Sequence, residues 1–151
     1  MEKLPELEEF DLEYAVGMTG SENALLNILK NYYYYLGKTS DNLNKYVSEI
    51  DNSKGLDLYR NEVHSLKSSS KSVGALLVSQ IARLLELASK AGDLERIRMV
   101  NPILLEQIER HKKILSVLVY EDKEKVDRSV ILPLLEMLEN KIASKKERVL
   151  F

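Results

Sequence analysis

His64 and the residues just after it are the part of this sequence whose types and spacing best suit chemistry. The 151-residue chain has no cysteine and only two histidines, which excludes thiol nucleophiles, cysteine-ligated metals and histidine-rich metal sites. A neutral imidazole is a competent nucleophile near pH 7. Lys67 follows one helical turn later, where its ammonium group could hold the oxygens of a phosphoryl group added to the ring. The small residue Ser68 leaves room for another protein surface to approach.

The helix predicted around His64 has an apolar side and a cationic side. With ~100° of rotation per residue, the apolar stripe consists of Tyr59, Val63, Leu66, Ser70 and Val73. His64 points about 140° away from that stripe. The same outer sector holds Arg60, Lys67, Ser68 and Lys71. From this geometry alone the simpler interpretation is an ordinary solvent-facing histidine, and a phosphoacceptor held among cations is the alternative.

The other segments of the chain also have helical spacing of their apolar residues. Capping residues and glycines divide them. The first three predicted helices run from Ser21 to Gly37, from Ser40 or Asp41 to about Ile50, and from about Leu56 to Val73. A fourth predicted helix ends at Gly92, and its inner stripe consists of Leu77, Ile81, Leu84, Leu85 and Ala88. Asp93 is expected to cap a short segment, and Asn101 with Pro102 to restart a helix that reaches Leu118. A last amphipathic stretch holds Ile131, Leu134, Leu135, Leu138 and Ile142.

These segments predict an all-α protein: an up-down-up-down four-helix bundle with a short N-terminal helix and an extra C-terminal helix. His111 falls on an inner stripe and is expected at the edge of the core. The run Tyr32–Tyr35 covers four directions of one helix, so at least one ring should face outward. We favour helix packing as the role of these tyrosines, with part of a docking surface as the alternative.

Length and charge limit the classes to which the chain can belong. Its length predicts one domain. The 22 basic and 24 acidic residues give a net charge of −2, whereas a general nucleic-acid binder usually has a basic excess. No apolar run approaches the ~20 residues needed to cross a bilayer, and the acidic start of the chain is not a secretory signal. We therefore expect a cytoplasmic protein with no nucleic-acid binding and no membrane insertion.

The sequence His64-Ser65-Leu66-Lys67-Ser68, followed by Val73-Gly74, resembles the signature of histidine-containing phosphotransfer (HPt) domains. In that family the histidine precedes any residue, a leucine, a lysine and a small residue, most often glycine, and a glycine follows ten residues after the histidine. Here Ser68 replaces the usual small glycine. The resemblance covers residues 8–118, which leaves 119–151 as a charged connector and an amphipathic helical extension. It is closest to HPt modules of bacterial hybrid sensor kinases, and a free-standing protein and a domain of a longer one both remain open.

The resemblance implies a phosphorelay intermediate. His64 would accept a phosphoryl group on Nε2 from an aspartate of a response-regulator receiver domain and pass it to another receiver. Lys67 would stabilise the phosphoryl group, and Ser68 would permit close approach. The chain would be a phosphocarrier and not an enzyme on its own, without a cofactor; the Mg²⁺ is expected on the receiver, and a hybrid histidine kinase is the other partner. A monomer is expected.

Three further residues have less certain roles. In some family members a glutamine at the position of Glu86 hydrogen-bonds the ring nitrogen that is not phosphorylated, and a basic residue stands at the position of Lys90. The Glu86 carboxylate could orient the ring in the same way, but it would repel a phosphate, so a plain surface residue is the favoured interpretation. Lys71 is expected to be a solvated helix charge more than a phosphate ligand.

Two other function classes remain open. The chain could be a helical adaptor that docks receiver or kinase domains without carrying phosphate. It could also be a structural bundle that forms oligomers through its tyrosines.

Overall fold

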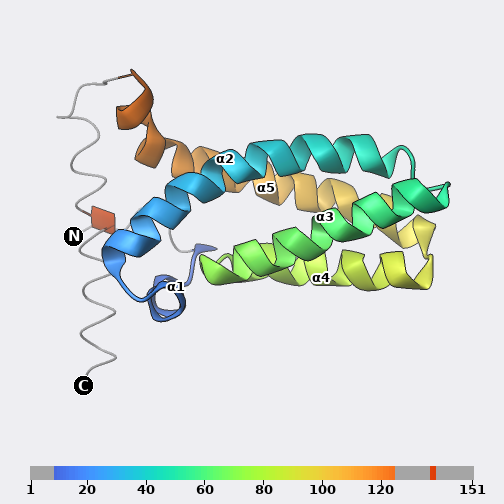
Figure 1. The fold of residues 1–151 in the computed structure, drawn as a ribbon, viewed down its shortest axis with the longest axis horizontal. Helices are drawn as coiled ribbons and strands as arrows, with labels where there is room; N and C mark the ends of the chain where they lie inside the picture. The colour runs from blue at the N-terminus through green and yellow to red at the C-terminus, as the bar shows by residue number, and fades with distance from the viewer. Residues whose placement is uncertain (1–8, 125–136, 139–151) are drawn as a thin grey trace.

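A computed structural model describes residues 9–124 and 137–138, and every regular element in these residues is a helix (Figure 1). The helices are α1 (Leu12–Thr19), α2 (Glu22–Val47), α3 (Ser53–Ser72), α4 (Leu76–Ala91) and α5 (Leu94–Glu124). The prediction of an all-α protein is therefore confirmed for the part that is described.

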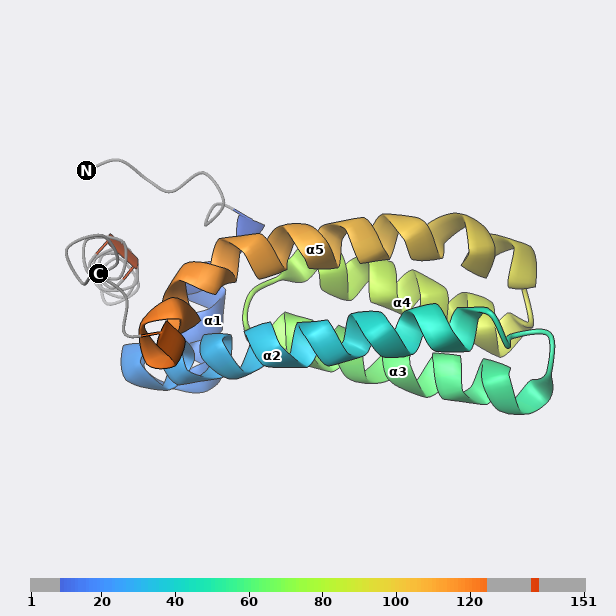
Figure 2. The same ribbon diagram turned by 90° about the horizontal axis from the view of Figure 1, so that it is seen from above.

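The four long helices pack in a ring. Helix α3 contacts α2 and α4, and α5 contacts the same two helices from the other side. Short turns at alternate ends reverse the chain between consecutive helices, as Figures 1 and 2 show. The short helix α1 packs on α2 and α3, at the end where α3 turns into α4. The arrangement is a helical bundle with its apolar core between the four long helices.

Helix α3 has the two sides that its sequence predicts. The five residues of its predicted stripe are all buried: Tyr59, Val63, Leu66, Ser70 and Val73. The hydroxyl groups of Tyr32 and Ser70 share a 2.7 Å hydrogen bond that joins α2 to α3. Tyr32 is buried and Tyr34 is exposed, which confirms that the tyrosine run has an outward ring.

The predicted helix break at Gly37 is wrong, since α2 continues through it to Val47. The N-cap predicted at Ser40 or Asp41 is therefore wrong as well, whereas Ser21 does cap α2 by accepting from Ala24 N at 3.1 Å. A glycine inside a helix costs only about 1 kcal/mol. Burial of Leu36 and Leu43 on the same face of α2 outweighs this cost.

The predicted restart at Asn101 and Pro102 is also wrong, because both lie inside α5. Asp93 caps this helix by accepting from Arg96 N at 3.1 Å. The Asn101 side chain is buried and accepts a 2.6 Å hydrogen bond from the Tyr59 hydroxyl, which joins α3 to α5. Pro102 has no N–H to donate to the preceding turn, yet burial along α5 holds the helix together.

Helix α5 also continues past 118, where the bundle was predicted to end, to Glu124. The predicted C-terminal stretch from Ile131 to Ile142 lies outside the described residues, apart from 137–138. Leu138 is one of these two and is buried.

The inner face of α4 differs from the predicted one at two positions. Leu77 and Leu84 are 55% and 49% exposed. The buried face instead consists of Val78, Ser79, Ile81, Ala82, Leu85, Glu86, Ala88 and Ser89. Leucines occur on several sides of this helix, so their spacing does not define one direction. Among these buried residues, Ala82 and Ser79 are small enough to let neighbouring helices approach α4 closely.

The turn between α3 and α4 is held by Gly74. Its φ of +78° is in the left-handed region that glycine adopts at little cost. Its carbonyl accepts from Asp11 N at 2.9 Å. A Cβ added at Gly74 would lie 2.3 Å from the Asp11 carbonyl oxygen. The segment before α1 therefore rests directly on the glycine backbone.

We predict that Gly74→Ala destabilises the protein more than Gly92→Ala. Both glycines have positive φ, so each alanine costs about 1 kcal/mol or more for its left-handed backbone. Only Gly74 also has a backbone neighbour in the way, since nothing lies within 4 Å of a Cβ at Gly92. We expect this overlap to add about 1–3 kcal/mol. Urea unfolding of both variants measures the difference, and equal losses would contradict the packing account.

Candidate functional site

His64 lies near the middle of α3 with its side chain 59% exposed. The predicted outward direction is therefore confirmed. Its ring does not stand alone, because Nδ1 is 2.6 Å from Oε2 of Glu86 on α4. The site is built from the two helices that pack side by side.

Glu86 is only 5% exposed, so the favoured interpretation of a plain surface residue is wrong. The rotation of α4 turns this carboxylate toward α3. Its Oε1 accepts from Lys67 Nζ at 2.6 Å, and Lys90 Nζ lies 3.7 Å from Oε2. A buried charge is costly unless it is paired and hydrogen-bonded, and His64, Lys67 and Lys90 together meet that requirement.

The charge of Glu86 is stable over the physiological pH range. Burial raises the pKa of the carboxyl group, but hydrogen bonds from Lys67 and His64, together with the attraction of the same two groups, lower it to about 2. The group is therefore a carboxylate near neutral pH and can only accept hydrogen bonds.

This pairing fixes the tautomer of the imidazole. Because Glu86 only accepts, Nδ1 of His64 must carry the proton, and in a neutral ring the lone pair is then on Nε2. In residues 9–124 and 137–138 no hydrogen bond involves that nitrogen. The arrangement has the form of a base held in orientation by a carboxylate, with an exposed nitrogen available as a nucleophile.

Of the sequence-predicted residues, the structure brings His64, Lys67, Glu86 and Lys90 together around one carboxylate. The Lys67 ammonium uses one donor on Glu86, and two of its three N–H bonds remain. Lys90 is more exposed and sits at the edge of the site.

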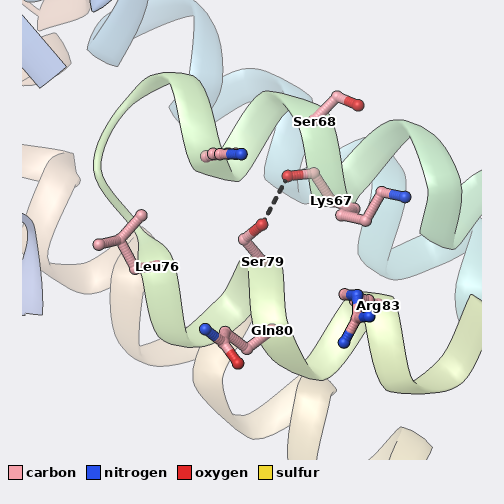
Figure 3. A pocket seen from close by; sticks show the side chains of 7 residues that line it. Lys67, Ser68, Leu76, Ser79, Gln80 and Arg83 are labelled. Carbon is pink, nitrogen blue, oxygen red and sulfur yellow. Dashed lines mark hydrogen bonds between the residues drawn. The ribbon is translucent and has the colours of Figure 1, made fainter. Parts of the chain in front are cut away.

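Ser68 and Lys71 are exposed and lie outside this cluster. They line a groove between α3 and α4 with Lys67, Leu76, Ser79, Gln80 and Arg83 (Figure 3). Sequence reasoning did not identify Arg83 or Gln80. Their spacing of three residues on one side of α4 was the available signal, but it has meaning only once α4 is placed against α3.

His111, the second histidine, is buried in the bundle as expected. Its ring packs on Phe10 with centroids 4.6 Å apart. Burial lowers the pKa of His111, against the opposing effect of Glu9. A neutral, enclosed ring does not offer a second site of the same kind.

The described part of the chain contains no group of three or more metal-ligating side chains. Within the same residues, no helix is long and apolar enough to span a membrane. Comparison with known proteins finds no family model, curated protein or solved structure that matches the chain. The interpretation of the site therefore rests on its residues and their geometry.

We predict that Glu86→Gln reduces the loss of stability in acid. The folded-state pKa of about 2 lies below the ordinary value of 4.5, so ionised Glu86 stabilises the fold above about pH 4.5, and this contribution is lost as the pH falls toward 2. A shift of this size corresponds to about 3 kcal/mol at most. Urea unfolding across this range should show a smaller decline for the variant than for wild type. Glu106→Gln, at an exposed carboxylate on α5, is the control and should keep the wild-type decline.

We also predict that the His64 ring is protonated on Nδ1. Nitrogen NMR of the neutral ring should show an unprotonated Nε2. Without an acceptor a free imidazole carries its proton mainly on Nε2, so Glu86→Ala should move the proton there. An Nε2–H tautomer in the wild type would contradict the orienting role of Glu86.

Proposed function

We propose that this chain is a histidine phosphotransfer protein. His64 accepts a phosphoryl group on Nε2 from the aspartyl phosphate of a receiver domain and later transfers it to the aspartate of another. The observation that carries the proposal is the exposed His64 ring, whose Nδ1 lies 2.6 Å from the buried Glu86 carboxylate. The resemblance of the His64–Gly74 segment to the HPt signature supports it independently.

The chemical step needs little from this protein beyond position and charge. The Nε2 lone pair attacks phosphorus, and the N–P bond forms as the P–O bond to the aspartyl carboxyl breaks. The electron pair leaves with the aspartate, which becomes a carboxylate. No proton moves: the ring keeps its Nδ1 proton and becomes an imidazolium next to the negative charge of Glu86. The reverse of this step loads the second receiver.

The cations around the ring suit this product. A phosphoryl group on Nε2 brings two negative charges, and Glu86 brings one. The imidazolium, Lys67 and Lys90 bring three positive charges. Lys67 keeps free N–H bonds for phosphoryl oxygens while it remains paired with Glu86, so the site is electrically balanced in the phosphorylated form.

The remaining parts of the proposal follow from the resemblance. The ring of α2, α3, α4 and α5 would be an HPt-like up-down-up-down bundle. The receiver would supply the aspartate and Mg²⁺, a hybrid histidine kinase would stand upstream, and the relay would operate in the cytoplasm with this chain as a monomer without a cofactor of its own.

The test is phosphoryl transfer from a phosphorylated receiver with Mg²⁺, with wild type and His64→Gln run in parallel. We expect label on the wild type alone, labile in acid and stable in alkali, with unchanged helix content in His64→Gln. Label on both proteins would place the site elsewhere. Label on neither, with receivers still binding both proteins, would favour the adaptor that docks without phosphate.

A further inference from the structure

A groove of about 520 Å³ lies next to His64, between α3 and the first half of α4. In Figure 3 Lys67 and Ser68 line it from α3, and Ser79, Gln80 and Arg83 line it from α4. Lys71 completes the α3 side. Three of the seven lining residues are cationic and none is acidic or aromatic, so the groove is a basic surface.

Two of these cations have no internal counter-charge. Within the described residues neither Lys71 nor Arg83 forms an ion pair, whereas other surface cations do, among them Arg60 with Asp57 and Arg98 with Asp51. Both side chains are exposed. A chain with a net charge of −2 therefore presents a local positive surface on the helix that carries His64.

Lys71 of the groove lies too far from the His64 ring to take part in binding a phosphoryl group there. Lys71 is seven residues after His64 on α3, which places it about 10 Å further along the helix axis. That distance is too long for contact with a phosphoryl group on the ring. It is short enough that a protein covering His64 also covers the groove, since Lys67 belongs to both.

The lining indicates what kind of anion would bind. No aromatic ring is present on which a nucleobase could stack. The Ser79 hydroxyl already donates to the Lys67 carbonyl at 2.9 Å, which leaves Lys71, Arg83, Ser68 and Gln80 as donors. These groups, together with the apolar Leu76, suit carboxylate side chains on a peptide backbone.

We propose that this groove binds an acidic segment of the receiver domain through Lys71 and Arg83, and that it orients the receiver's aspartate toward His64. The proposal rests on the proposed phosphotransfer function and names a docking determinant for it. Such charges act mainly on the rate of encounter and on its salt dependence, because exposed charges are screened over about 8 Å at physiological ionic strength.

The test compares wild type with the double variant Lys71→Glu/Arg83→Glu. The phosphorylated receiver is kept limiting and the salt concentration low. Under these conditions we expect the second-order rate constant for transfer to the double variant to be tenfold or more below that of wild type, and to depend less on salt. Labelling of His64 by phosphoramidate, a small donor with a P–N bond, should be unchanged because no protein docks in that reaction. The control variant Lys54→Glu/Lys113→Glu makes the same charge change at exposed sites on α3 and α5. Its rate constant for transfer from the receiver should fall much less.

Each outcome separates the two proposals. An unchanged receiver rate in the groove variant, or an equal loss in the control variant, overturns the docking role while phosphotransfer stands. No label on wild type from either donor overturns both. If inorganic phosphate shifts the NMR signals of Lys71 and Arg83 while the receiver rate is unaffected by their substitution, the groove is a small-anion site and the docking proposal is wrong.

Discussion

The buried carboxylate of Glu86 is the constraint on which this site depends. A charge that is nearly removed from water must be matched by partners at close range, or it destabilises the fold. Two of its partners, His64 and Lys67, are on α3, and α4 supplies Glu86 and Lys90. The pairing thus joins α3 to α4 at this point, and it fixes which ring nitrogen of His64 carries the proton.

Other polar contacts hold the same helices without using the side chains of His64, Lys67, Glu86 or Lys90. The Ser79 hydroxyl donates to the carbonyl of Lys67 across the α3–α4 contact. The Gly74 turn, against which Asp11 packs, limits where α4 can begin. Each of these contacts satisfies a buried or partly buried polar group, so together they select one packing of the helices from those that the apolar residues alone would permit.

The sequence predicts α3 well because its five inner residues form one narrow stripe, which leaves His64 on the outside. It predicts α4 less well. Leu77, Leu84, Leu85 and Leu87 point in several directions, so the rotation of α4 depends on contacts with α3 that are remote in the sequence. The burial of Glu86 and the groove at Arg83 follow from that rotation. The helix boundaries predicted at Gly37 and Pro102 are wrong for a different reason. The helix-breaking tendency of a single glycine or proline is weaker than the stabilisation from burial along a long helix.

The hydrogen bonds at Tyr59 and Ser70 have a consequence for how a signal could be stored. Each ties α3 to a different neighbour, α5 in one case and α2 in the other, and His64 lies between them along the helix. The helix that bears the ring is thus clamped on both sides of it. In the proposed phosphotransfer, a phosphoryl group on this ring would change the local charge on a helix that is held to both neighbours, so the receiver would recognise the phosphoryl group itself and not an altered shape of its carrier.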